Sequence, residues 1–169
     1  MTVLETERLS LRQFTVDDAQ FILKLLNEPS FLRYIGDKKV RNLEDARQYI
    51  LNGPVASYER NGFGLYLVEL KESYTPIGMC GFLKREELPD PDIGFAFMPE
   101  FWSKGFAFEA AAALLQDARE RLKLERILAI TSLDNDASIK LLQRLGFNFD
   151  RVITLAAGRE QVKLFTRIK

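Results

Sequence analysis

Three apolar segments follow one another between residues 62 and 101, and only tight polar turns separate them. They are GFGLYLVEL (62–70), TPIGMCGFLKR (75–85) and PDIGFAFMPEF (91–101), and each is rich in the branched and aromatic residues that favour strands. Strands joined by such turns pair in antiparallel fashion, so the sequence predicts a meander of three neighbouring strands. Any fold for this chain has to be built around that sheet.

The segment before the meander changes its hydrophobic period twice. The stretch ERLSLRQF (7–14) alternates apolar and polar residues, which predicts a half-buried strand. Thr15 and Asp18 have the spacing of a capping box, which opens a helix whose apolar face ends before Pro29. A second helical region is expected from about residue 42 to residue 58.

The segment after the meander continues the mixed pattern. It predicts a helix that starts near Gly105 and turns Ala107, Ala111, Leu114, Leu115 and Leu122 toward a core, a strand at 126–132, a helix at 135–147 that ends at Gly146, and two strands at 148–156 and 160–168. No repeat, low-complexity segment or linker interrupts this order. We therefore expect one α+β domain over residues 1–169.

Composition excludes several classes of protein. The chain of 169 residues carries 24 Lys and Arg, 24 Asp and Glu, no histidine and one cysteine, Cys80. Balanced charge gives no general attraction to nucleic acid, and no apolar run approaches the ~20 residues that cross a bilayer, so we expect a cytoplasmic protein without membrane or nucleic-acid partners. Without histidine we expect no metal site and no Ser-His-Asp or Cys-His hydrolase. A general base must then be a carboxylate, a tyrosine, a lysine or a water, and Cys80 is expected in the core.

The stretch FWSKGFAFEAAAALL (101–115) places a glycine at the start of a strong helix. Glycine costs about 1 kcal/mol in a helix relative to alanine, so its position calls for a reason. The first turn of a helix carries unpaired N–H groups and a positive dipole end, and glycine lets an anion such as a phosphate approach them closely. The alternative is structural: Ser103 is an N-cap, Gly105 a turn residue, and the alanines a packed stripe.

Two longer motifs favour the first alternative. LDNDASIKLLQRLGF (133–147) resembles the N-x-x-S…L-G-F motif of the GNAT N-acetyltransferases, and DIGFAFMPEFWSKGFAFEA (92–110) is similar to the E-I-G-Y…P-x-Y-W-G-K-G-Y-A-T-E-A segment of their RimJ/RimL-type branch. The opening LETERLSLR resembles the T-E-R-L-x-L-R start of that branch, and PIGMCGF is similar to its third strand. The resemblance therefore covers most of the chain.

The resemblance implies an acyl-CoA fold, in which a mostly antiparallel central sheet is flanked by helices. Two neighbouring strands splay apart, and the pantetheine arm of acetyl-CoA lies in the gap. The family's Q/R-x-x-G-x-G/A pyrophosphate loop falls on residues 102–107, that is Trp102, Ser103, Lys104, Gly105, Phe106 and Ala107, and Phe108 follows it. The resemblance holds at Gly105 and Ala107 and departs at Trp102, as this branch commonly does. Ser103 stands where the branch usually has glycine, and Phe108 stands where it usually has threonine. These departures leave the backbone N–H donors of the loop in place.

The same resemblance assigns roles to residues on both sides of this loop. Backbone groups around Phe97 and Met98 are expected to meet the pantetheine arm and the acetyl carbonyl, while their side chains belong to the core. Asn135 matches an asparagine whose amide bonds the cofactor arm, although alone it would more often be a helix cap. Ser138, one helical turn later, matches a serine near the thioester sulfur, where it could give a hydrogen bond or a proton.

Asp92 stands at the position of the family's glutamate in E-I-G-Y. A carboxylate there can take the proton of an attacking amine, directly or through water. Aspartate is one methylene shorter than glutamate, so a solvated turn carboxylate after Pro91 is the alternative. Glu86 and Glu87 are the other carboxylates that could act as the base.

Together, these features predict an acetyl-CoA-dependent N-acetyltransferase that transfers the acetyl group directly to a primary amine, with Ser138 and Asp92 as catalytic residues. The acceptor is either a protein N-terminus or a small-molecule amine. The alternative is a non-catalytic acyl-CoA-binding or regulatory module. Aromatic residues such as Phe31, Phe63, Phe101 and Trp102 suit either a core or a partner surface, so the sequence leaves the oligomeric state open.

Overall fold

The computed structural model describes residues 1–155 and 160–168 of the chain. Within these residues, eight strands form one sheet in the order β1-β2-β3-β4-β5-β6-β8-β7. The strands are β1 (Thr2–Glu5), β2 (Leu9–Gln13), β3 (Leu65–Leu70), β4 (Pro76–Leu83), β5 (Asp92–Phe97), β6 (Arg126–Ser132), β7 (Asn148–Leu155) and β8 (Glu160–Ile168). All neighbours pair antiparallel except β5 and β6, which are parallel.

Helices occupy the segments between the strands. They are η1 (Val16–Asp18), α1 (Ala19–Leu26), α2 (Pro29–Tyr34), α3 (Leu43–Ile50), the π-helical turn η2 (Leu51–Val55), α4 (Ala56–Asn61), η3 (Pro99–Phe101), α5 (Phe106–Glu120) and α6 (Asp136–Arg144). None of these helices is long and apolar enough to cross a membrane.

The predicted meander is confirmed, because β3, β4 and β5 pair in sequence order with antiparallel registers. The third segment is shorter than expected: β5 ends at Phe97, and Pro99 begins the single turn η3. The two C-terminal strands, β7 and β8, also form as predicted. Residue 156, placed at the end of the first of them, lies outside the described residues.

The N-terminal part differs from the prediction in two places. Thr15 and Asp18 form the expected capping box, and α1 follows with Ile22 and Leu25 buried. Pro29 follows the end of α1 and also begins α2. Proline is favourable at the first helical position, because the N–H that it lacks would have no intrahelical partner there. β1 was not predicted; it pairs with β2 and extends the edge of the sheet.

Two apolar layers hold the helices against the sheet. One cluster joins α5 and α6 to one face, and it contains Ala111, Leu114, Leu142 and Phe165. A second cluster joins α1, α2 and α3 to the opposite face through Ile22, Phe31 and Ala46, among others. The predicted core face of α5 is confirmed for Ala111, Leu114 and Leu115, which are buried, whereas Ala107 and Leu122 are partly buried.

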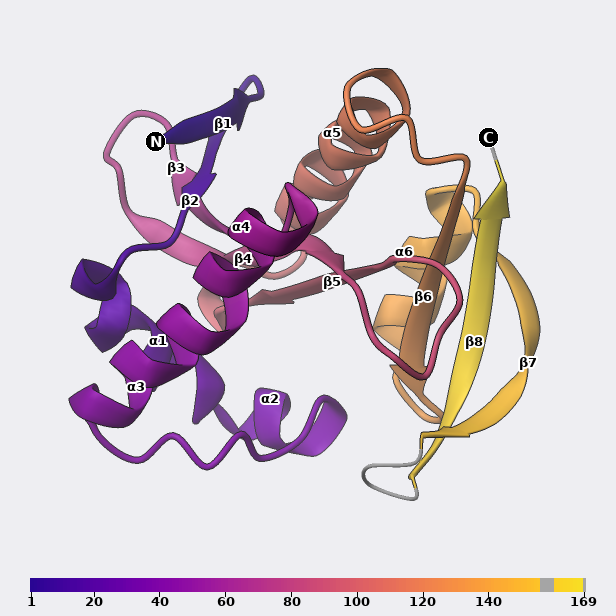
Figure 1. Cartoon of the computed structure of the whole chain (residues 1–169), viewed down its shortest axis with the longest axis horizontal. Helices are drawn as coiled ribbons and strands as arrows, with labels where there is room; N and C mark the ends of the chain where they lie inside the picture. Colours follow the sequence, from indigo (N-terminus) through magenta and orange to yellow (C-terminus); the bar gives the residue numbers. More distant parts are fainter. Residues whose placement is uncertain (156–159, 169) are drawn as a thin grey trace.

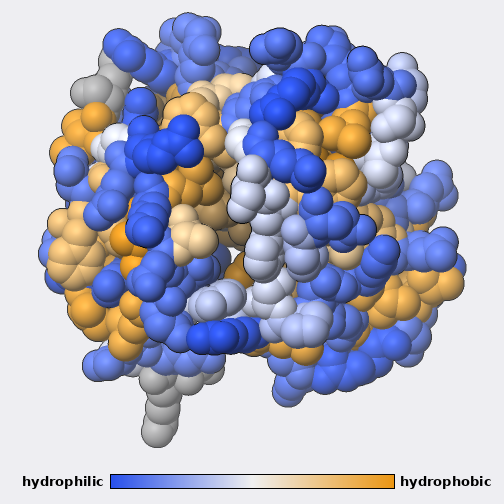
Figure 2. Space-filling view, turned by 180° about the vertical axis from the view of Figure 1, so that it is seen from behind, coloured by the Kyte–Doolittle hydropathy of each residue, from blue (hydrophilic) through white to orange (hydrophobic). Residues whose placement is uncertain are grey.

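The direction of the strands changes between β5 and β6. In Figure 1, β5 runs across the picture, whereas β6 and β8 stand almost upright beside it. The sheet therefore divides into an N-terminal half, β1 to β5, and a C-terminal half, β6 to β8. Seen from behind, the surface has a hollow near its middle, between two more solid halves (Figure 2).

Candidate active site

The candidate site begins where β5 and β6 separate. The two strands pair at Asp92 and Leu128 only, and the Leu128 N–H donates to the Pro91 carbonyl at 2.9 Å. β5 stays paired with β4 up to Phe97, and β6 stays paired with β8 up to Ser132. The splayed pair of strands is thus present, with its closed end at Asp92 and its open end at Phe97.

Backbone groups line this gap. Residues of a strand direct their N–H and C=O alternately to the two sides, and the Met98 N–H donates to the Ile77 carbonyl of the β4 side at 2.9 Å. Phe97 and Phe95 therefore direct their peptide groups away from β4, into the gap. By the same alternation Ile130 and Ser132 face the gap from β6, because Leu128 bonds to the β5 side. A ligand with amide groups can pair with both walls.

The loop at the open end has the geometry that the glycine suggested. Gly105 is the N-cap residue of α5 and has φ +82°, in the left-handed region that favours glycine. Ser103 also has a positive φ of 61°. The helix that follows is 15 residues long, and its first N–H groups have no intrahelical partner. In the structural alternative, the N-cap role of Ser103 is wrong, because Gly105 occupies that position without a side-chain cap. Its other two parts agree with the structure, since Gly105 has the backbone of a turn residue and alanines of α5 such as Ala110 and Ala111 are packed in the core.

Residues of the turn between β1 and β2 are bonded to this loop and to the start of α5. The Glu109 carboxylate accepts from the Thr6 hydroxyl, from the Arg8 N–H at 2.9 Å and from the Arg8 Nε at 2.7 Å. Arg8 Nη1 also donates to the Lys104 carbonyl at 3.0 Å, and its guanidinium lies 4.3 Å from the centre of the Phe106 ring. Thr6, Arg8 and Glu109 are not among the site residues that the sequence predicted.

We expect Glu109→Gln to lower the free energy of unfolding by about 1–2 kcal/mol, because charge-assisted hydrogen bonds are lost. Burial raises the pKa of Glu109, but bonds from Thr6 and Arg8 outweigh it and leave the pKa lowered. The ion-pair contribution is therefore present at neutral pH and is lost as pH falls through that lowered pKa. Urea unfolding at pH 7 and pH 3 tests this, with the exposed Glu125→Gln as control. Equal stability of wild type and Glu109→Gln at pH 7 would contradict it.

The backbone groups of Phe97 and Met98 differ in whether they are free to face the gap. Both side chains are buried, as expected for core residues. The Met98 N–H donates to the Ile77 carbonyl, and the Met98 carbonyl accepts from the Phe101 N–H at 2.9 Å, so both of its backbone groups have protein partners. The Phe97 carbonyl accepts from the indole Nε1 of Trp102 at 2.9 Å. The Phe97 N–H is the backbone donor that faces the gap here.

Asn135 and Ser138 lie at the start of α6, which follows the gap-lining strand β6. Asn135 is the N-cap residue, and its side-chain oxygen accepts from the Ser138 N–H at 3.3 Å. Ser138 is partly buried. Arg144 of α6 lies 4.4 Å from the centre of the Phe108 ring of α5, so the two helices beside the gap are in contact. The assignment of Asn135 as a helix cap is correct, and its amide nitrogen is left for other partners.

Asp92 is the first residue of β5 and lies at the closed end of the gap. Its side chain is 1% exposed, and Arg85 Nε donates to its two oxygens at 3.1 and 3.3 Å. Burial raises the pKa of Asp92 to about 6, against the lowering influence of Arg85. The alternative of a solvated turn carboxylate is therefore wrong. A carboxyl with this pKa is mostly ionised at neutral pH and is protonated in mild acid.

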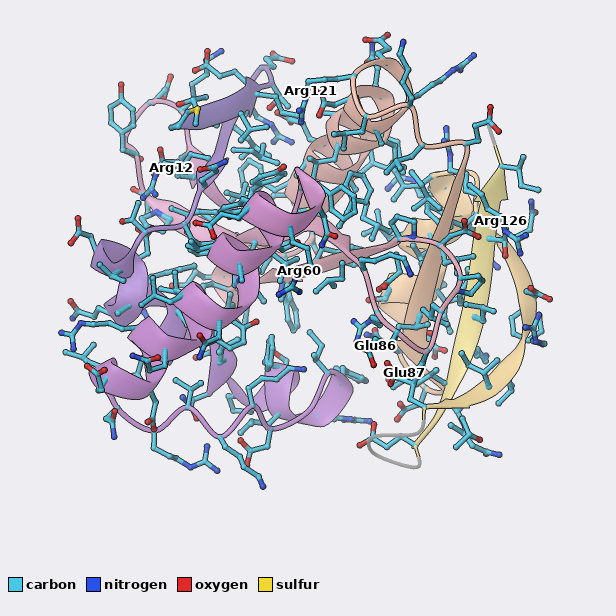
Figure 3. The ribbon with its side chains drawn as sticks, in the orientation of Figure 1. Arg12, Arg60, Glu86, Glu87, Arg121 and Arg126 are labelled. Carbon is cyan, nitrogen blue, oxygen red and sulfur yellow. The ribbon has the colours of Figure 1, made fainter. Side chains whose placement is uncertain are left out.

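The other candidates lie in different surroundings. Glu86 and Glu87 are exposed on the loop between β4 and β5, and Figure 3 shows both away from the start of β5. Cys80 is fully buried in β4, and burial raises the pKa of its thiol, as expected for a core residue. In residues 1–155 and 160–168, no cluster of three metal-binding side chains occurs.

Comparison with known proteins agrees with this geometry. The family model described as "Acetyltransferase (GNAT) domain" matches residues 8–148. The chain is 32% identical to the uncharacterized N-acetyltransferase YoaA of Bacillus subtilis over 89% of its own length and 85% of that protein. It is 33% identical to the uncharacterized N-acetyltransferase p20 of Bacillus licheniformis, over 87% and 83% of the two chains.

Solved structures with low sequence identity share the fold. An acetyltransferase from Agrobacterium tumefaciens aligns with a TM-score of 0.84 at 23% identity, over 100% of this chain and 95% of that one. RimL, a ribosomal L7/L12 α-N-protein acetyltransferase solved with coenzyme A, aligns with a TM-score of 0.85 at 19% identity, over 99% and 98%. The acyl-CoA fold predicted from the motifs is thus confirmed, including its splayed sheet.

Proposed function

Because the chain belongs to the GNAT family of N-acetyltransferases, we propose that it transfers the acetyl group of acetyl-CoA directly to a primary amine, with the residues around the β5–β6 gap as its active site. The observation that carries this proposal is the combination of an open parallel strand pair with a glycine-started helix at its open end. Backbone groups facing the gap and unpaired N–H groups of α5 fit the amide arm and the phosphates of CoA, respectively.

We assign the binding residues as follows. The N–H groups of the loop and first turn, from Ser103 through Lys104, Gly105, Phe106 and Ala107 to Phe108, hold the phosphates. The peptide group of Phe97 and the amide of Asn135 bind the arm. Met98 is left out of this assignment, because its backbone groups already have partners.

Few protein groups are needed for the chemistry. Acetyl-CoA supplies an activated acetyl group. An amine is mostly protonated at neutral pH and has to lose a proton before it attacks. The neutral amine that attacks loses a further proton as its nitrogen is acylated, and Asp92 accepts that proton, directly or through water. Ser138 gives a hydrogen bond or a proton to the leaving sulfur, and a backbone N–H in the gap stabilises the oxyanion.

The acceptor is proposed at the level of chemistry. The RimJ/RimL-like segment 92–110 and the fold shared with RimL support the N-terminal amine of a protein, and a small-molecule amine is the second class. The non-catalytic alternative is not favoured, because Asn135 and Ser138 are both present at the start of α6 and the relatives of similar length are named N-acetyltransferases.

Release of free CoA tests the proposal. Purified protein is mixed with acetyl-CoA and a panel of amines, peptides with free N-termini included, and the new thiol is measured with a chromogenic disulfide. We expect thiol release that depends on the acceptor and a product whose mass has increased by one acetyl group. Binding of acetyl-CoA without acceptor-dependent release from any amine would favour the regulatory module.

Ser138→Ala is expected to lower kcat by about tenfold, the loss of about one hydrogen bond to the sulfur, and to leave the affinity for acetyl-CoA within twofold. The effect is moderate because a thiol has a reference pKa of about 8.5, so a thiolate leaves without complete protonation. Ser73→Ala, a change of the same size in the exposed turn between β3 and β4, is the control. Full kcat in Ser138→Ala would assign protonation of the sulfur to water.

A further inference from the structure

The only tryptophan of the sequence, Trp102, connects two parts of the site that are separate in the chain. It comes directly before the loop residue Ser103, and its indole N–H donates to the carbonyl of Phe97, the last residue of β5, at 2.9 Å. Its own backbone N–H donates to the Pro99 carbonyl at 3.1 Å, which ends η3. The side chain thereby closes the turn between the gap wall and the phosphate loop.

This contact decides which hydrogen-bonding group the wall offers at its open end. Phe97 directs both its N–H and its C=O away from β4, as the bond from the Met98 N–H to the Ile77 carbonyl requires. The indole N–H fills one acceptor position of the Phe97 carbonyl, whereas the Phe97 N–H has no protein acceptor among the described residues and is the donor that the wall offers to a ligand. An N–H donates to an acceptor, so the ligand group that binds there is one such as a carbonyl oxygen.

We infer that Trp102 is a positioning residue, which holds the Phe97 carbonyl so that the end of β5 presents its N–H to a carbonyl oxygen of the acyl-CoA arm. The inference rests on the proposed function. Trp102 acts through Phe97 and needs no contact with the reacting atoms. Trp102 is 48% exposed, which agrees with a place at the open end of the gap rather than in the core.

Trp102 and Arg8 bond to different residues around the loop. Arg8 donates to the Lys104 carbonyl, and Trp102 donates to Phe97, so the loop keeps its bond from Arg8 when the indole N–H is removed. Loss of that N–H alone is therefore expected to disturb the wall of the gap and to leave the phosphate-binding turn in place. This difference separates a positioning role from general support of the loop.

The test compares two ligands that differ in the arm. Trp102→Phe keeps an aromatic ring and removes the N–H. By calorimetry, we expect its Kd for CoA to rise roughly five- to tenfold, the loss of about one hydrogen bond. Its Kd for adenosine 3′-phosphate 5′-diphosphate, which keeps the three phosphates of CoA and lacks the pantetheine arm, is expected to stay within twofold of wild type. In kinetics, KM for acetyl-CoA rises, while kcat and KM for the amine stay within twofold.

Tyr74→Phe is the matched control, since it changes an aromatic residue that is 71% exposed in a turn outside the site. If Trp102→Phe lowers the affinity for both ligands equally, the inference is overturned and Trp102 only supports the loop. If the affinity for CoA is unchanged, the inference is overturned as well. In the wild-type protein, the emission of the single tryptophan is expected to change on titration with CoA. Failure of the wild type to bind CoA by calorimetry is a different result and would sink the proposed function itself.

Discussion

Gly105→Asp is expected to weaken the binding of acetyl-CoA by about 100-fold in a protein that remains folded. Gly105 is the N-cap of α5 with φ +82°, and aspartate is one of the few side chains that tolerate this conformation. The new carboxylate would stand beside the phosphates that the loop is proposed to hold. Repulsion between unit charges about 4 Å apart is worth roughly 1–4 kcal/mol in solvent-exposed surroundings.

Gly105→Asn is the matched control, because asparagine has the same size and tolerates positive φ but carries no charge. A Cβ at this position comes within 3.3 Å of Arg8 Nη2, so both variants share the same steric change. We expect the asparagine variant to lose less than tenfold in affinity, and the gap between the two variants to narrow as salt is added. Unchanged affinity in a folded Gly105→Asp protein would remove the loop from the phosphate site.

The elements of the fold that the sequence predicts well are those whose signals are local. The meander from β3 to β5 is recognisable because its strands and turns alternate within a few residues. β1 escapes prediction because a strand of 4 residues carries too few positions to show a period, and it is stabilised by pairing with β2. The role of Pro29 is ambiguous in the sequence, since proline is common both after the end of a helix and at the first position of one.

The site residues that the sequence did not assign depend on contacts between distant segments. Glu109 meets Thr6 and Arg8 across more than 100 residues of chain, and no spacing in the sequence reveals such a pair. The T-E-R-L and A-x-E-A motifs contain the three residues, but similarity alone does not say that they touch. The structure gives their physical role, which is to hold the start of α5 against β2.

The surroundings of Asp92 follow from packing that is equally remote. Leu88, in the polar loop before β5, is buried against Leu128 of β6 and Leu164 of β8. The loop is thereby folded back over the start of β6, and Arg85 of the same loop reaches the carboxylate. Most residues of this loop are polar, which predicts a solvated loop, so the burial of Asp92 does not follow from the sequence.

This buried carboxylate gives the second large effect: Asp92→Asn is expected to lower kcat/KM at pH 7 by about 10²–10³-fold, the usual value of a general base. Asparagine keeps the shape and one acceptor for Arg85. The fold is expected to survive, because burial raises the folded pKa of Asp92 above its unfolded value. Ionisation of such an acid lowers stability as pH rises, so an uncharged residue is tolerated at pH 7.

The shape of the pH profile separates the base from a structural role. With a peptide N-terminus as acceptor, whose pKa is about 8, log kcat/KM of the wild type should rise with a slope of about one between pH 6 and 8. Below the pKa of Asp92, about 6, protonation of the carboxylate adds to that of the amine, and the slope should approach two. Asp92→Asn should keep a slope of about one throughout, because the amine alone still titrates.

Asp92→Glu restores the residue of the resembling motif, so it serves as the variant that keeps a carboxylate. It is expected to retain the steeper acid limb and more activity than Asp92→Asn, reduced by the extra methylene in a packed site. Wild-type and Asp92→Asn profiles that coincide in height and slope would exclude Asp92 as the base. Proton removal would then pass to the exposed Glu86 or Glu87, or to water, and the Arg85–Asp92 pair would remain a structural contact at the closed end of the gap.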